Sequence, residues 1–234
     1  MRKEGCEDNL PKKTRVKFTT MAYIARKLEE ATGKPTTAAS TQSRLVNVMS
    51  PWVNEGFFAD IAVLVEGESD RAAIVEVAKQ TAVDFEKTGI SVIPVMGKTK
   101  LDRPHLIFTE LGIKTYIVFD SDKSKGKDGK PDTNKLLLKL CGHPEEEFPK
   151  TSVRENMACF EEALPATLRE EIGAQLYEQL LNQYSCELGY SPPKEGEKNP
   201  LVISNIVEEA YRGGRKAKTV EDIVEKIVAL KRGG

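Results

Sequence analysis

Two stretches of the chain decide its fold: Ala62-Val-Leu-Val-Glu-Gly-Glu-Ser-Asp70 and Tyr116-Ile-Val-Phe-Asp-Ser-Asp122. Each begins with a short, continuous apolar run, rich in branched or aromatic residues, and each ends in acidic residues. Continuous apolar runs of this length are typical of strands that are buried on both faces, as in a parallel sheet. The sequence therefore predicts two parallel strands that both end in carboxylates.

The acidic residues that follow these strands are expected to lie close together. In an open α/β sheet the carboxyl ends of the strands share one edge, so Glu66 should lie near Asp120 and Asp122. Asp70 falls in the first turn of the helix expected from Ser69, which brings it to the same edge. Four carboxylates repel one another unless a cation neutralises them, and oxygen ligands favour Mg²⁺, Mn²⁺ or Ca²⁺. For any single acid, a solvated strand end or a helix cap is the ordinary alternative.

Strands and helices alternate along the middle of the chain. Residues 69–85 carry apolar residues at helical spacing, and residues 90–96 are expected to form the next strand. Pro94 within that strand is typical of an edge position. Further helices are expected over residues 20–32, 104–111, 134–141, 166–190, 201–211 and 220–230. The alternation predicts an α/β fold with a parallel sheet flanked by helices.

Composition excludes several classes of protein. The 234 residues carry 35 Lys+Arg and 36 Asp+Glu, a formal net charge of -1, so any surface that binds nucleic acid must be local. The four cysteines have no CxxC spacing, and with two histidines they predict neither a zinc site nor a disulfide framework. No stretch approaches the ~20 apolar residues of a membrane span. These features predict a soluble protein of the reducing cytoplasm.

Glycine and lysine residues near the acidic edge are candidates for binding phosphate. Gly97 follows the second expected strand and lets the backbone approach a ligand closely, and Lys98 and Lys100 beside it are able to neutralise phosphate charge. Lys123 and Lys125 begin a run rich in glycine and lysine, with no apolar anchor, which is expected to be an exposed, mobile loop. A plain strand-to-helix turn and a merely solvated loop are the alternatives.

The ordered set of acids and glycines resembles the Toprim domain of topoisomerases, primases and related nucleases. The lead-in Phe57-Phe-Ala-Asp60, directly before the first strand, is similar to the OLD (overcoming lysogenization defect) family of ATP-dependent nucleases. The resemblance covers residues 55–165 well and the remainder loosely. The residues that carry it in the body of the domain are Glu66, Gly67, Asp70, Gly97, Asp120 and Asp122.

The resemblance also implies roles for residues later in the chain. In the segment from Ser152 to Leu164, an acidic residue would complete a second metal site, with Glu161 as the first candidate and Glu155 as the second. A catalytic lysine is implied just before the last helix, which matches Lys218 or Lys216. The alternatives are ordinary acids on a helix surface and a basic loop at a helix start, although positive charge there runs against the helix dipole.

As a whole, the resemblance implies hydrolysis of phosphodiester bonds in DNA with two Mg²⁺ ions, about 3.5 to 4 Å apart as in other two-metal sites. Glu66 and Asp70 would belong mainly to one ion, Asp122 and Glu161 to the other, and Asp120 would bridge them. A lysine would stabilise negative charge in the transition state. Two alternatives stay open: another Toprim enzyme, such as an RNA-processing nuclease or a primase, and a non-catalytic module in recombination or repair.

The expected division of the chain follows the same resemblance. Residues 1–54 would be a lead-in, either the tail of an ATPase domain or a linker, and residues 55–165 the catalytic core. Residues 166–212 would be a helical insertion, and residues 213–234 a loop and helix that complete the Toprim domain. The sequence has no GxxxxGK[ST] phosphate loop, so no ATP site of that kind is expected here. An ATPase domain in cis, or a partner protein in trans, is implied together with DNA, and the family suggests phage defence.

Overall fold

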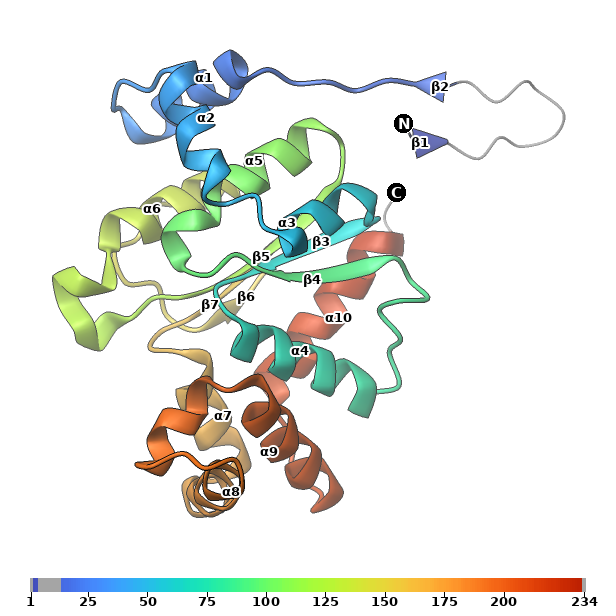
Figure 1. Ribbon diagram of the computed structural model, residues 1–234, viewed down its shortest axis with the longest axis vertical. Helices are drawn as coiled ribbons and strands as arrows, with labels where there is room; N and C mark the ends of the chain where they lie inside the picture. Colours follow the sequence, from blue (N-terminus) through green and yellow to red (C-terminus); the bar gives the residue numbers. More distant parts are fainter. Residues whose placement is uncertain (1, 4–13, 233–234) are drawn as a thin grey trace, which may run out of the picture.

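The computed structural model describes residues 2–3 and 14–232. Within these residues, a five-stranded sheet forms the centre of the molecule, and helices cover both of its faces (Figure 1). Two short strands, β1 (Arg2–Lys3) and β2 (Thr14–Arg15), pair with each other apart from this sheet. No helix among the described residues is long and apolar enough to cross a membrane.

The strand order of the central sheet is β4-β3-β5-β7-β6. β3 lies between β4 and β5 and is parallel to both, and β5 is parallel to β7. β6 is antiparallel to β7 and closes the far edge. The strands span Ile61–Val65 (β3), Ile90–Pro94 (β4), Lys114–Asp120 (β5), Ser152–Val153 (β6) and Met157–Phe160 (β7). β4 is an edge strand, which confirms the expectation from Pro94.

The side chains of β3 explain why its sequence is a continuous apolar run. Ile61, Val63 and Val65 pack into the hydrophobic cluster on one face of the sheet, while Ala62 and Leu64 pack into the cluster on the other. All five are essentially inaccessible to solvent. A strand that is buried on both faces cannot alternate apolar and polar residues, because each side chain meets a covered face. The predicted α/β fold with a parallel sheet flanked by helices is confirmed.

The helices divide between the two faces. The cluster around Val63 includes residues of α4, α7, α8, α9 and α10, and the cluster around Leu64 includes residues of α1, α2, α3, α5 and α6. The first group spans Glu68–Gln80 (α4), Leu164–Ile172 (α7), Ala174–Glu187 (α8), Pro200–Arg212 (α9) and Lys218–Arg232 (α10). The second spans Met21–Thr32 (α1), Ala38–Val46 (α2), Pro51–Glu55 (α3), Asp102–Glu110 (α5) and Pro131–Leu140 (α6).

Two helices differ from the sequence-based expectation. The single helix expected over residues 166–190 is two helices, because Gly173 separates α7 from α8 with φ 103°, a conformation that no α-helix accommodates. The helix expected to reach Phe85 ends at Gln80, and Ala82 follows with φ 59°. In both places the apolar spacing continues through a break in the backbone, so spacing alone hides the end of the helix.

Candidate active site at the carboxyl ends of the strands

Glu66 and Asp120 meet at the carboxyl ends of two neighbouring strands. β3 and β5 pair in parallel with Leu64 opposite Ile117, so the ends of both strands lie at one edge of the sheet. Glu66 follows β3 directly, and Asp120 is the last residue of β5. The backbone amide of Asp120 donates a hydrogen bond of 2.8 Å to Glu66 Oε1. The structure thus places together the two acids that the sequence assigned to different strands.

Asp70 reaches the same edge from the first turn of α4. Its Oδ2 accepts a hydrogen bond of 2.8 Å from the Gly67 amide, which ties the helix start to the end of β3. The carboxylate of Asp120 is held in a similar way, because its Oδ1 accepts a 3.1 Å bond from the Leu164 amide at the start of α7. Backbone amides therefore orient Glu66, Asp70 and Asp120.

The pKa values of these three acids reflect first their burial and then, for Glu66 and Asp120, their like-charged neighbours. Burial raises the pKa of Glu66 to about 7, against the opposing hydrogen bond from the Asp120 amide, and the charge of Asp70 adds to the rise. Burial likewise raises the pKa of Asp70 to about 6. The pKa of Asp120 is raised well above its usual value by burial and then by the charges of Asp70 and Glu66. Partly buried carboxylates that repel one another bind protons readily, and would bind a metal cation for the same reason.

Lys98 is the cation that the protein itself supplies at this edge. It begins the 3-10 helix η2 (Lys98–Lys100), and its side chain is only 3% exposed. Its ammonium group donates to the Asp120 carbonyl at 2.6 Å, the Gly129 carbonyl at 2.7 Å and Asp122 Oδ2 at 2.8 Å. Because these contacts match the three donors of an ammonium group, Lys98 holds the end of β5 to the segment that follows it.

Asp122 lies in surroundings unlike those of Asp120. Its backbone is left-handed, with φ 57°, and its second carboxylate oxygen accepts a 2.6 Å bond from Lys125 Nζ. Burial alone would raise the pKa of Asp122, but the hydrogen bonds from Lys125 and Lys98 outweigh it, so the pKa is lowered. Asp122 therefore stays ionised, with a lysine at each oxygen.

The comparisons with known proteins bear on this edge of the sheet. Residues 57–122 match the family model described as "Overcoming lysogenization defect protein-like, TOPRIM domain". This segment is an OLD-like Toprim domain. The recognition made from the sequence is confirmed, and a domain of this kind indicates a nuclease of the Toprim family.

Solved structures of OLD proteins are among those similar to the chain. The C-terminal region of the Burkholderia pseudomallei OLD protein is 18% identical with a TM-score of 0.47, over 75% of this chain and 100% of that one. The C-terminal region of the Xanthomonas campestris pv. campestris OLD protein is 16% identical with a TM-score of 0.47, over 76% of this chain and 96% of that one. A comparison with curated proteins gives no match.

Of the later acids proposed for the Toprim site, Glu161 lies beside it, whereas Glu155 precedes β7 and so lies toward the opposite ends of the parallel strands. Glu161 follows β7, and its Oε1 accepts a 2.5 Å bond from Lys123 Nζ, while its backbone carbonyl accepts the Lys123 amide at 3.1 Å. Glu155 instead pairs with Lys226 of α10 at 2.5 Å. Of the two candidates, Glu161 lies against the segment that follows Asp122. Its role as a ligand stays a prediction.

The two candidate lysines near the last helix pair with acids of that helix. The sequence suggested that Lys218 lies in a loop before the last helix. In the structure α10 begins at Lys218, so this lysine is the first helical residue. Its Nζ lies 2.6 Å from Asp222 Oδ1, and Lys216 Nζ lies 3.9 Å from Glu221 Oε1. Within the described residues, no hydrogen bond or ion pair joins either lysine to the acids at the strand ends.

Gly97 directly precedes Lys98, and Lys100 ends the same short 3-10 helix. The Gly97 amide donates 2.8 Å to the Glu66 carbonyl, and its φ of 127° suits glycine alone, so a glycine is required here. A Cβ at Gly97 would meet no atom within 4 Å, which leaves open space beside the acids. Lys100 is partly exposed and lies on the same short turn.

Sequence reasoning missed a residue that fastens the segment after β5. Asn134 is fully buried, and its Nδ2 donates to the Ser121 carbonyl at 3.0 Å and to the Glu147 carbonyl at 2.7 Å. The sequence did contain a signal for this role, because Asn134 falls on the same helical stripe as Leu137 and Leu138. A buried side-chain amide on such a stripe needs hydrogen-bond partners.

The donor atoms at the strand ends suit a hard divalent cation. Glu66, Asp70 and Asp120 offer only oxygen ligands, and burial raises the pKa of each, with like charges adding to the rise for Glu66 and Asp120, so a cation would stabilise their charged forms. As placed, however, no group of three or more His, Cys, Asp or Glu residues in the described part of the chain is close enough together to hold a metal ion. The acids therefore fit such an ion in charge and donor type, and their side chains would have to move closer to bind it.

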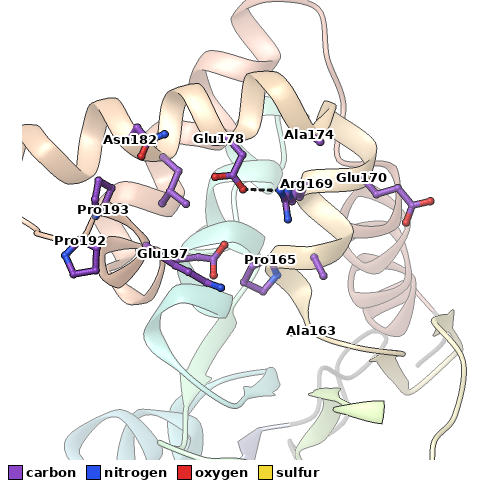
Figure 2. Close-up of a pocket in the computed structure, with 13 residues that line it drawn as sticks. Ala163, Pro165, Arg169, Glu170, Ala174, Glu178, Asn182, Pro192, Pro193 and Glu197 are labelled. Carbon is purple, nitrogen blue, oxygen red and sulfur yellow. Dashed lines mark ion pairs between the residues drawn. The ribbon is translucent and has the colours of Figure 1, made fainter. Parts of the chain in front are cut away.

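A cavity of about 830 Å³ lies beside this edge, between α7, α8 and the 3-10 helix η4 (Pro193–Lys198). Figure 2 shows Arg169 of α7 paired with Glu178 of α8, 3.0 Å apart, with Pro165 and Glu197 below them in the view. The cavity begins at Ala163, next to the residue whose amide binds Asp120. None of the acids at the strand ends lines it, so it is a neighbour of the site and not the site itself.

Proposed function

We propose that this protein is a metal-dependent DNA endonuclease or nickase of the OLD type. The observation that carries the proposal is the convergence of Glu66, Asp70 and Asp120 at the carboxyl ends of β3 and β5, within the segment that matches the OLD-like Toprim domain. Three acids with raised pKa values, on rigid elements and held by backbone amides, are a costly arrangement for a protein with no cation to bind.

The proposed site would hold two Mg²⁺ ions, with Mn²⁺ or Ca²⁺ as possible substitutes. Glu66 and Asp70 would hold mainly one ion, Asp122 and Glu161 the other, and Asp120 would bridge them. When bound, the ions supply positive charge at the scissile phosphate and favour attack by water. The division of ligands between the ions is part of the proposal.

The protein's own residues would orient the substrate. Hydrogen bonds from the Asp120 and Gly67 amides orient Glu66 and Asp70, and the open space at Gly97 would admit the nucleic acid backbone beside them. Lys100, Lys123 and Lys125 would contact phosphates around the acids, as would Lys98 if it left its three partners. Lys216 or Lys218 would stabilise the negative charge that develops on the phosphate.

The rival functions make different demands on the same site. An RNA-processing nuclease or a primase would use the same acids on another substrate. A non-catalytic module in recombination or repair would bind nucleic acid without cleaving it. The lead-in from Phe57 lies inside the matched segment, and this match to an OLD-like domain favours the DNA nuclease.

The partners of the proposed enzyme are DNA and an ATPase, either in cis or as a separate protein in trans. A role in phage defence follows from the family and is part of the proposal. We also place the protein in the cytoplasm, because Cys141, Cys159 and Cys186 are all free thiols, as is usual in a reducing compartment. Cys6 lies outside the described residues.

Incubation of the purified protein with supercoiled plasmid tests the proposal. Nicked or linear DNA should form with Mg²⁺ or Mn²⁺ and not with EDTA, and RNA of matched length should stay intact. Cleavage of RNA alone would favour the RNA-processing alternative. Binding of DNA without cleavage under any divalent ion would favour the non-catalytic module.

A further inference from the structure

Two acids at the rim of the site each hold a lysine from the same short segment, the 3-10 helix η3 (Lys123–Gly129). Lys125 Nζ lies 2.6 Å from Asp122 Oδ1, and Lys123 Nζ lies 2.5 Å from Glu161 Oε1. These are the two acids that the proposed function assigns to the second ion. The positive charge expected there from a metal is thus supplied by these two ammonium groups together with that of Lys98, which binds the other oxygen of Asp122.

The other three acids have no such partners. Glu66, Asp70 and Asp120 accept hydrogen bonds from backbone amides, and within the described residues none of them forms an ion pair with a lysine or arginine. The site is therefore asymmetric in charge: the carboxylates of its inner half have no ion pair among the described residues, and those of its outer half are each paired with a lysine. A first divalent ion gains more from the inner half.

The two lysines of η3 differ from Lys98 in how firmly they are held. Lys98 is 3% exposed and has three partners, whereas the side chains of Lys123 and Lys125 are 53% and 63% exposed. Ion pairs of lysines this exposed contribute little to stability, so water, a metal ion or a phosphate displaces them easily. Lys98 is a fixed cation, while Lys123 and Lys125 are exchangeable ones.

The backbone of η3 allows that exchange without loss of its anchor points. Lys98 binds Asp122 at one end of the segment and the Gly129 carbonyl at the other. Between them, Gly126 breaks the helical geometry with φ 53° and ψ -126°. The lysine side chains are therefore free to turn toward solvent while both ends of η3 stay fastened to the sheet.

We propose that Lys123 and Lys125 are exchangeable counterions of Glu161 and Asp122, which occupy the place of the second divalent ion until the phosphates of the nucleic acid draw them away. The inference rests on the proposed function, and it adds an order of events: the inner ion binds first, and the outer ion and the DNA help each other to bind. The lysines act as positioning residues, because one charged group serves the acids or the phosphates but not both.

Calorimetric titration of the protein with Mn²⁺, without DNA, tests the first half of this inference. The wild-type protein should bind one ion more tightly than a second. Lys125→Met and Lys123→Met should each tighten the second ion by about two- to fivefold, the range expected for loss of one exposed ion pair, and leave the first ion unchanged. The matched control is Lys127→Met, which removes the same charge from an exposed lysine of η3 that has no ion pair with any described residue.

Anisotropy of a fluorescent DNA duplex in Ca²⁺ tests the second half. If Ca²⁺ releases both lysines to the phosphates, the wild-type protein should gain up to two phosphate contacts over the double variant Lys123→Met/Lys125→Met. The slope of log affinity against log salt should then be steeper by about 0.9 for each contact. Equal slopes for the two proteins would show that the lysines do not reach the DNA and would overturn the coupling.

The outcomes separate this inference from the proposed function. If the wild-type protein cleaves DNA but the second Mn²⁺ binds equally tightly to wild type and double variant, the counterion inference alone is overturned. An equal shift in Lys127→Met would mean that general loop charge is responsible, which also overturns it. If the wild-type protein neither binds Mn²⁺ nor cleaves DNA, both the proposed function and the counterion inference are overturned.

Discussion

Asp120 and Asp122 are two residues apart, yet they belong to regions with opposite electrostatics. Asp120 lies at the inner side of the acidic edge with Glu66 and Asp70, where burial and like charges raise its pKa. Asp122 lies at the outer side, where Lys98 and Lys125 lower its pKa against the effect of burial. The inner region is held by backbone amides and the outer region by lysines.

The difference shows how one sheet edge supplies both a binding site for cations and a frame for it. The repulsion within a cluster of carboxylates destabilises the fold unless other interactions offset it. Hydrogen bonds from backbone amides to the inner acids offset part of this repulsion. The outer acids instead stabilise the local fold, because their charges are matched. Variants of the inner region should therefore change activity most, and variants of the outer frame should change stability.

The largest effect is expected from Asp120→Asn. The amide keeps an acceptor for the Leu164 amide but removes the charge that a divalent ion needs, so plasmid nicking should fall at least about 10³-fold. Because one repelling charge is removed, the midpoint of urea unfolding should be unchanged or higher. Nicking at the wild-type rate, or a clearly lower unfolding midpoint, would show that the inner region is not the catalytic one.

The second-largest effect on activity is expected from the lysines at the start of α10. Either Lys216→Ala or Lys218→Ala, but not both equally, should lower the single-turnover cleavage rate at saturating DNA by about 10²-fold, as for loss of one group that stabilises developing charge. The two side chains are 70% and 64% exposed and, among the residues that the structure describes, form ion pairs only with Glu221 and Asp222, so neither variant should lose stability. Small, equal losses that depend on salt would mean that both lysines only bind DNA.

The inner region was predictable from the sequence, and the outer region was not. Glu66 and Asp120 end continuous apolar runs, and parallel strands bring such ends together whatever the details of packing, so their meeting follows from the strand pattern alone. The ion pairs of Lys98 and Lys125 depend on side-chain directions in turns, for which the sequence has no periodic signal. The run after Asp122 was expected to be a mobile loop, but it forms the helix η3, fastened by Lys98.

The helices, too, were only partly predictable from the sequence. Apolar spacing located most of them but not α2 or α3, and it did not show the break at Gly173, because α7 and α8 both bury their apolar stripes in the same cluster. Lys98 illustrates the limit for charged residues: a lysine beside glycine after a strand is a natural candidate for phosphate binding. Its burial is set by Asp122 and the Gly129 carbonyl, which are distant in the sequence.

Lys98→Met should have the largest effect on stability. The substitution leaves Asp122 with one fewer partner and the Asp120 and Gly129 carbonyls without their donor, and loss of one member of a buried ion pair costs about 3 kcal/mol. Urea unfolding followed by circular dichroism measures the change. Lys100→Met, from the same turn but partly exposed, should change the free energy of unfolding by less than about 0.5 kcal/mol. Equal losses in the two variants would contradict the role of Lys98 as the anchor of the outer region.

The smallest expected effect on stability is that of Gly129→Ala. This variant tests whether the outer region supports the structure of the acidic edge. A Cβ at Gly129 would lie 2.4 Å from the Asp122 carbonyl oxygen and 3.0 Å from its Cβ, so the two backbone segments that Lys98 joins would have to separate. Overpacking of this kind costs about 1 to 3 kcal/mol, and the cost should appear in the free energy of unfolding.

The control for this substitution is Gly213→Ala at the end of α9. There the nearest atoms to the added Cβ are carbonyl oxygens at 3.4 and 3.5 Å, so the change in stability should stay within about 0.5 kcal/mol. Because the atoms nearest an added Cβ at Gly129 all belong to Asp122, the variant should also keep the affinity of the first Mn²⁺ ion while it alters the second. A loss of the first ion instead would mean that the two regions form one inseparable unit, and the comparison between them would fail.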